Sequence, residues 1–342
     1  FATLNVVDLL VDDDLTVTDD VAIGGLATVG GTLGVTGIAT FTDDIIIGDG
    51  KTIGSASTVG AMTIASNGDV TFADGSDIIT ASAGTSNLRL GVNAGNSIAS
   101  GGNFNVVVGD EAGTALTTGD QNVAIGFEAL ATEDTRGGST ALGYRALKAQ
   151  NGDTANTHNV AIGADAGLSL STGNRNVYVG ALSGDANTTG DGNTAVGHNT
   201  LSTNTHSENN VAVGYEALKT FNVGSGSGYN TAVGSVAGTA LTTGIQNTII
   251  GGLAGDALTD ADNNVAIGYK ALGADTLGTD SIAIGLQALR DQNFTTATAS
   301  HNVAIGRDAG VVITTGVENT LIGGLAGDAI TTAYYNTALG KD

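Results

Sequence analysis

A short motif recurs along most of this chain. From residue 87 onward an Asn is followed by three mostly apolar residues and a Gly, as in Asn122–Gly126, Asn159–Gly163 and Asn264–Gly268. The motif occurs fifteen times, usually every 17 residues, and a longer step after every fourth copy adds a superperiod of 71–72 residues. Such a chain grows as an array along one axis, rather than by enlarging a single core.

Within one repeat, residue alternation favours a β-strand. In Asn122–Gly126, Val123 and Ile125 lie on one face of an extended chain and Ala124 on the other. A second short apolar stretch, such as residues 115–118, precedes the next Asn, so we expect two short strands and two turns per repeat. The alternative, a helical turn at pairs such as Ala217–Leu218, is too short to form an independent helix. The prediction is an all-β protein: a parallel β-roll, or β-solenoid, with one coil per repeat over residues 87–342.

Stacked coils would place equivalent residues about 4.8 Å apart. The recurrent Asn therefore predicts a structural ladder in which each side-chain amide bonds to a neighbouring coil. Its members are Asn105, Asn122, Asn159, Asn176, Asn193, Asn210, Asn230, Asn247, Asn264, Asn302, Asn319 and Asn336. Two repeats carry Ser139 and Ser281 at this position. The motif Gly is expected at positive φ or where chains approach closely. The recurrent Ala forms either a flat face that docks another chain, as in a trimer, or the lining of a thin interior.

Residues 1–86 lack the motif but alternate strongly, as in Leu15–Ile23 and Leu33–Phe41, with Gly and Asp at the expected turns. Few of these segments are long enough for a free-standing sheet. We predict a β-rich, intertwined, β-helical shaft or connector, in which partner chains supply the missing strand pairing.

Composition narrows the possible functions. The chain has no Cys and a net charge of −23, so it has no thiol nucleophile and would repel nucleic acid. No apolar run is long enough to insert in a membrane. His158 and His301 occupy equivalent positions two blocks apart, about 38 Å along a stacked rod, so they cannot share a metal within one chain. We predict no enzyme, with no catalytic residue, cofactor site or metal site.

Calcium is the one ligand considered, at acidic stretches such as residues 12–14 or at the recurring Asp185, Asp256 and Asp328; surface solvation is the preferred interpretation. Three longer loops, residues 148–158, 219–229 and 290–301, recur once per superperiod. They contain aromatic residues that are rare in this chain: Phe221, Tyr229 and Phe294. Loops on a rigid scaffold commonly carry recognition, so these residues are the predicted contacts for a receptor or glycan.

The Asn-Val-Ala-Ile-Gly and Asn-Thr-Ala-Val-Gly units resemble the head repeats of YadA-like trimeric autotransporter adhesins and similar arrays in the tail fibres of marine bacteriophages. The segments Leu15–Thr18 and Gly37–Phe41 resemble phage fibre shafts. The resemblance implies a left-handed parallel β-roll, assembled as a homotrimer, that binds host or tissue surfaces. The repeat is longer than typical adhesin head repeats, and neither coiled-coil heptads nor membrane-anchor strands are seen, which favours a phage fibre.

The functional hypothesis is therefore a homotrimeric, extracellular phage tail fibre that attaches to the host. Its expected partners are further copies of itself, a host-surface glycan or protein, and other fibre or virion proteins. One alternative is a bacterial surface adhesin with the same fold. Another is a protomer that polymerises end to end, suggested by the uncapped last motif at Gly340–Asp342.

Overall fold

The computed structural model describes residues 51–55, 58–64, 70–72, 83–151 and 157–341. The chain divides into two compact units, residues 1–77 and 78–342. In the first unit, β1 (Lys51–Ser55), β2 (Thr58–Ile64) and β3 (Val70–Phe72) form an antiparallel sheet in the order β1-β2-β3. The predicted shaft segments Leu15–Ile23 and Leu33–Phe41, and the acidic stretch at 12–14, lie outside the described residues.

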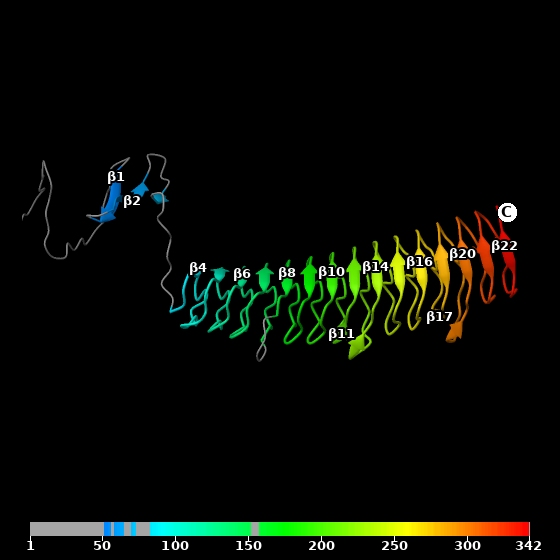
Figure 1. The fold of residues 1–342 in the computed structure, drawn as a ribbon, viewed down its shortest axis with the longest axis horizontal. Coiled ribbons are helices and arrows are strands. Elements are labelled where there is room, and N and C mark those ends of the chain that lie inside the picture. The colour runs from blue at the N-terminus through cyan, green and yellow to red at the C-terminus, as the bar shows by residue number, and fades with distance from the viewer. Residues whose placement is uncertain (1–50, 56–57, 65–69, 73–82, 152–156, 342) are drawn as a thin grey trace, which may run out of the picture. The chain divides into compact units, whose positions relative to one another are not determined.

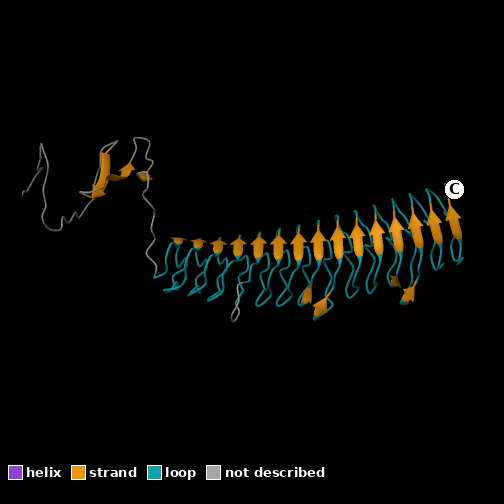
Figure 2. Ribbon diagram, in the orientation of Figure 1, coloured by secondary structure: helices purple, strands orange, loops and turns teal. Residues whose placement is uncertain are grey.

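The second unit is a solenoid in which every repeat contributes one strand to a single parallel sheet of fifteen strands (Figures 1 and 2). Neighbouring strands pair in register, so that Val123 faces Thr140 and Ala124 faces Ala141. The prediction of an all-β parallel β-solenoid with one coil per repeat is confirmed. The strands are β4 (Leu88–Leu90), β5 (Val106–Val108), β6 (Val123–Ile125), β7 (Thr140–Leu142), β8 (Val160–Ile162), β9 (Val177–Val179), β10 (Thr194–Val196), β12 (Val211–Val213), β14 (Thr231–Val233), β15 (Thr248–Ile250), β16 (Val265–Ile267), β18 (Ile282–Ile284), β20 (Val303–Ile305), β21 (Thr320–Ile322) and β22 (Thr337–Leu339).

The prediction of two strands in every coil is wrong. The second apolar stretch, such as residues 115–118, consists of turns and bends, although its backbone still bonds to the next coil, with Thr117 N–H donating to the Asp134 carbonyl at 2.7 Å. Left-handed residues between the strand and this stretch, such as Glu128 (φ 52°) and Leu130 (φ 53°), bend the chain away from strand geometry. Among the described residues of the solenoid, second strands occur only at two longer loops, where β11 (Ser207–Glu208) pairs with β13 (Gly226–Ser227), and β17 (Gly278–Thr279) pairs with β19 (Thr298–Ala299).

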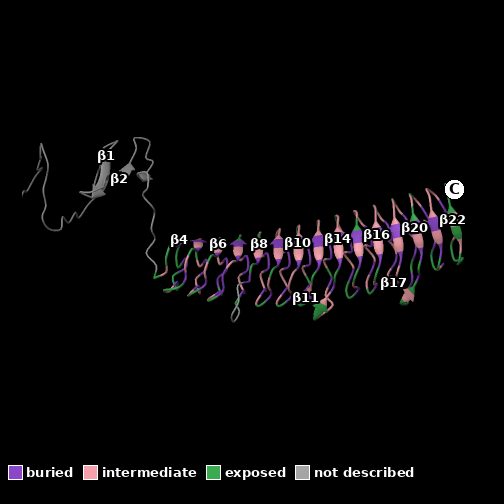
Figure 3. Ribbon diagram, in the orientation of Figure 1, coloured by how far each residue is buried: buried purple, intermediate pink, exposed green. Residues whose placement is uncertain are grey.

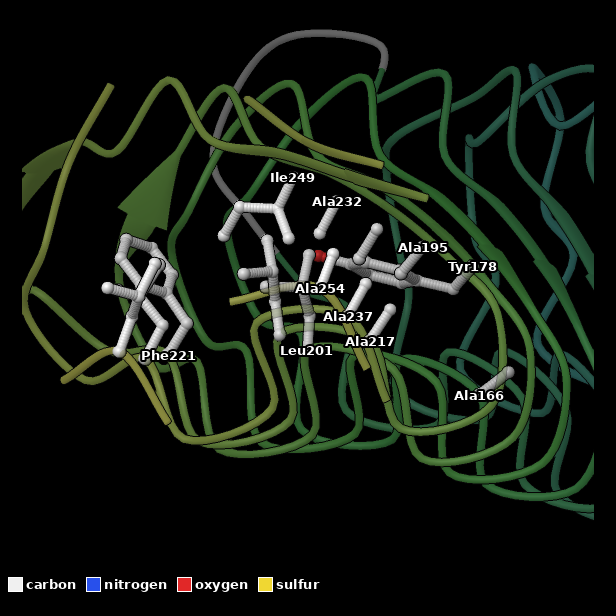
Figure 4. Packing of buried hydrophobic residues seen from close by; sticks show 14 of the residues in the cluster. Ala166, Tyr178, Ala195, Leu201, Ala217, Phe221, Ala232, Ala237, Ile249 and Ala254 are labelled. Atoms are coloured by element: carbon white, nitrogen blue, oxygen red, sulfur yellow. The ribbon is translucent and has the colours of Figure 1, made fainter. Parts of the chain in front are cut away.

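The core is a column of buried side chains inside the coils, mainly Ala and Leu with a few larger residues such as Tyr178 (Figure 4). Buried residues recur in every part of the rod, as Figure 3 shows. The central strand residue, such as Ala124, Ala195 or Ala232, points inward and is fully buried, and so is a second Ala, such as Ala217 or Ala237, in the following turn. The recurrent Ala therefore lines the interior. It does not form an outer docking face, because the alternation of the strand directs its two flanking side chains outward.

Two kinds of coil fill this interior differently. The fourth residue after the motif Gly is Leu in six coils, for example Leu218, and Gly in eight, and the fully buried Leu side chain fills the core. Where that residue is Gly, the second coil of each block compensates with a larger central strand residue. A Cβ on Gly184 would lie 2.6 Å from Cδ1 of the buried Tyr178 ring. The 71-residue superperiod is thus a pattern of volume compensation along the core.

Candidate functional surfaces

The Asn column joins each coil to the next from the inside. Oδ1 of Asn247 accepts the backbone N–H of Asn264 at 2.9 Å, and its Nδ2 donates to the Ala261 carbonyl at 2.7 Å. Both partners belong to the following coil. Each side chain thereby satisfies a buried donor and a buried acceptor that would otherwise be unpaired.

The remaining ladder residues follow this scheme with small variations. In ten of them the side-chain Oδ1 accepts a hydrogen bond from the backbone N–H of the residue at the ladder position of the next coil. These ten are Asn105, Asn122, Asn159, Asn176, Asn193, Asn210, Asn230, Asn264, Asn302 and Asn319. Nδ2 of Asn210 instead donates to the Glu208 carbonyl and to Oδ1 of Asn193, and the backbone N–H of Asn336, the last ladder residue, donates to Oδ1 of Asn319. The column is structural, because its amides are occupied by the backbone.

Two buried polar clusters interrupt the ladder where Ser replaces Asn. Beside Ser139, Gln150 Nε2 donates to Glu133 Oε2 at 2.8 Å, and Gln150 Oε1 accepts from Asn159 Nδ2 at 2.9 Å. Thr157 completes this cluster through a hydroxyl contact with Ser139. The long Gln side chain thus takes over the cross-coil bonding that the shorter Ser cannot provide.

The second cluster repeats the first one two blocks along the rod. Beside Ser281, Gln292 Nε2 donates to Asp275 Oδ2 at 2.6 Å, and Gln292 Oε1 accepts from Asn302 Nδ2 at 2.9 Å. In the intervening block the corresponding residues are Asn204, Asn210 and Phe221. The acid, the Ser and the Gln of the polar clusters are therefore all three replaced in the block that lacks the cluster.

Burial raises the pKa of the carboxyl groups of both Glu133 and Asp275, although hydrogen bonds from Gln150 and Gln292 oppose the shift. Glu133, Ser139, Gln150, Thr157 and Asn159 are all fully buried, so no substrate can reach this acid. Sequence reasoning missed both clusters. The signal was present in Ser139 and Ser281, each followed eleven residues later by Gln.

The predicted receptor contacts are not brought together on one surface. Phe221 is 0% exposed and Phe294 is 5% exposed, whereas Tyr229 is 59% exposed. Phe221 replaces the Gln of the polar clusters and packs into the core, because an apolar ring fills that space without needing hydrogen bonds. The assignment of Phe221 and Phe294 as receptor contacts is therefore wrong, and Tyr229 alone remains accessible.

The outer face of the fifteen-stranded sheet is uncharged along its whole length and consists of aliphatic side chains and Thr. Each strand directs its first and third residues outward, and none of these residues is charged, although the chain carries a net charge of −23. The third residue is always Val, Ile or Leu, and several, including Leu142, Ile162, Ile250 and Ile305, are more than a third exposed. Rows of exposed aliphatic side chains of this kind are more typical of interaction surfaces than of the rest of a protein surface.

A second exposed feature follows the motif Gly. Phe127 and Tyr144 stack with ring centroids 5.5 Å apart, and His198 and Tyr215 stack at 5.8 Å. In the next block Tyr269 occupies the position of His198, and Leu286, one coil further on, occupies the position of Tyr215. Phe127, Tyr144, Tyr215, Tyr269 and Leu286 are all two-fifths to about half exposed. We call these three pairs the aromatic bands. Sequence analysis missed them, although they follow the 71-residue period.

Metal and membrane features are few. Within the described ranges, His, Cys, Asp and Glu form no group of three that could hold a metal ion, and His158 and His301 are exposed. No helix that could cross a membrane occurs among those residues. The fold defines the class, a parallel β-solenoid repeat protein. Comparison with models of known families, with curated proteins and with solved structures finds no significant match.

Proposed function

We propose that this chain is the rod of a homotrimeric extracellular fibre, of the type found in bacteriophage tails, that holds adhesive surfaces away from the particle and attaches to a host. The observation that carries the proposal is the uncharged outer face of the sheet. Three copies around a common axis would bury these Val, Ile and Leu side chains against one another, which removes an apolar face that an isolated rod leaves in water.

The dimensions support this assembly. Fifteen coils at about 4.8 Å give a strip roughly 70 Å long, and two outward residues make it roughly 7–10 Å wide. The strip therefore offers on the order of 500–700 Å² per copy, or about 1,500–2,100 Å² in all three copies together, which is comparable with the total area of a standard specific interface. Parallel, in-register packing would also stack identical neutral rows, so the acidic loops stay on the outside, where their repulsion is weakest.

Mass photometry and light scattering test the proposal. We expect a particle of three times the 33.5 kDa chain mass. Val196→Glu combined with Val213→Glu places two charges on the outer face and should give monomers. Tyr229→Glu adds a charge to an exposed loop and should leave the trimer intact. A monomeric wild-type protein at micromolar concentration would overturn the proposal.

Attachment is tested separately by binding of the labelled trimer to host cells. The exposed Tyr229 is the remaining candidate contact among the predicted loop residues. Tyr229→Ala should reduce binding without changing the mass of the particle. Unchanged binding would remove Tyr229 from the attachment surface.

A further inference from the structure

The aromatic bands alternate with gaps of the same width. In the third and fourth coils of each block, the residue after the motif Gly is bulky. In the two coils between the first and second bands it is Ala164 and Ala181, and between the second and third bands it is Ser235 and Gly252. We call these two gaps the slots. Stacking within one chain explains the rings, but it does not require two-coil gaps between them.

The slot width matches a ring pair of this chain. Tyr144 and His198, the walls of the first slot, lie three coils apart, or roughly 14 Å along the rod. The stacked pair Phe127–Tyr144 spans 5.5 Å between centroids. Such a pair centred in the slot would lie about 4.5 Å from each wall, at the short end of the 4.5–7 Å range of favourable aromatic pairs. A single flat ring in the same slot could contact only one wall.

Charge also permits close approach at the bands. Arg145 pairs with Asp165 at 2.8 Å, and Lys148 pairs with Glu128 at 2.6 Å. In the next band, Lys219 pairs with Glu216 at 2.8 Å. The bands are therefore locally balanced on a chain whose net charge is −23, so they are the places where two rods repel each other least.

We propose that a second copy of this chain docks side by side with the first, displaced by two coils, so that two aromatic bands of each copy enter the two slots of the other. Two coils with a bulky residue after the motif Gly alternate with two coils that have a small one. A shift of two coils, half of the four-coil block, therefore places bulky residues of one copy opposite small residues of the other. This contact uses the turn after the motif Gly rather than the outer sheet face, so it goes beyond the proposed trimer and does not depend on it.

The surface area that the two copies would bury predicts a weak contact. An aromatic side chain buries roughly 150–250 Å², and half-exposed rings contribute about half of that. A two-coil shift places two bands of each copy in the contact, with three rings from one copy and four from the other. Seven rings give on the order of 500–900 Å² in total, which is below the usual size of a specific interface. Lateral pairing should therefore be reversible at micromolar concentrations and stronger at 0.5 M salt, where repulsion between the acidic rods is screened.

Filling the slots tests the proposal. A Cβ on Gly252 would meet Tyr269 Cδ2 at 3.7 Å, an ordinary contact, so Gly252→Tyr should fold while occupying one slot. Ala181→Tyr occupies the other. In sedimentation velocity at 0.5 M salt, the wild type should associate with increasing concentration, and the double variant should do so at least tenfold more weakly. Gln246→Tyr is the control, because it adds a ring outside the slots at a position where Tyr229 and Tyr335 occur naturally.

Removing a band gives an independent measurement, because Tyr215→Ala should also weaken association. Association that is absent, or unchanged by filling both slots, overturns the proposal. Binding of a saccharide that Gly252→Tyr abolishes, without self-association, would instead make the slot a carbohydrate site. The mass at low concentration separates this test from the trimer test, since slot variants leave the outer sheet face intact.

Discussion

Two adjacent glycines, Gly251 and Gly252, provide a matched test of how tightly the coils stack. Gly251 is a motif Gly with φ +138°, and a Cβ there would lie 2.6 Å from the carbonyl oxygen of Gly268 in the next coil. Gly252 follows directly, has no such restriction on φ, and has its nearest neighbour at 3.7 Å. Replacing each by Ala adds the same methyl group in two different environments.

The expected difference follows from two costs at Gly251. Holding Ala at this positive φ costs about 1–3 kcal/mol. Displacing the backbone of the next coil adds about 1–3 kcal/mol, as in other overpacked sites. Gly251→Ala should therefore destabilise its coil by about 2–6 kcal/mol. Gly252→Ala should lie within about 0.5 kcal/mol of the wild type, or stabilise slightly through the unfolded state.

Hydrogen exchange measured by mass spectrometry is the suitable assay, because coils contact only their neighbours and can open locally. Amides between residues 248 and 268 should lose at least about 30-fold in protection in Gly251→Ala, since 1.4 kcal/mol corresponds to a factor of ten. They should be nearly unchanged in Gly252→Ala. Equal effects of the two substitutions would refute the conclusion that close stacking of coils requires the motif Gly.

Three further predictions concern the interior. Asn247→Ala leaves the Asn264 N–H and the Ala261 carbonyl without their partner, and thermal or denaturant unfolding should show a loss of about 2–5 kcal/mol; a change below about 0.5 kcal/mol would contradict the ladder. Phe221→Ala should cost about 3–5 kcal/mol in the same assay, whereas Tyr229→Ala should have little effect; similar effects would contradict the difference in burial. Burial raises the pKa of Glu133 above its ordinary value of 4.5, so its contribution to stability is present below about pH 4.5 and is lost as the pH rises through the folded pKa. Glu133→Gln should therefore flatten stability as a function of pH above 4.5, and Asn204→Asp, at the equivalent neutral position, should introduce a new dependence; unchanged pH profiles in both would contradict it.

Much of the architecture could be predicted from short sequence patterns. Alternation in Asn122–Gly126 and its recurrence every 17 residues predicted a parallel β-solenoid, because strand geometry and coil length are properties of neighbouring residues. The second strand in each coil could not be excluded in this way. Its residues look apolar and extended, whereas the residues that precede it, such as Glu128 and Leu130, have left-handed backbone angles that a pattern of apolar residues does not reveal.

Whether an individual side chain is buried or exposed depended on the space available within and between the coils. Ala124 could equally have lined the interior or an outer face, and packing within the coil assigned it to the interior. Phe221 lies in a loop by sequence, yet it fills the volume that Gln150 and Gln292 occupy in other blocks. The aromatic bands arise from residues 17 positions apart that stacking brings to about 5.5 Å. Such contacts are set by how the coils pile up, which no short stretch of sequence encodes.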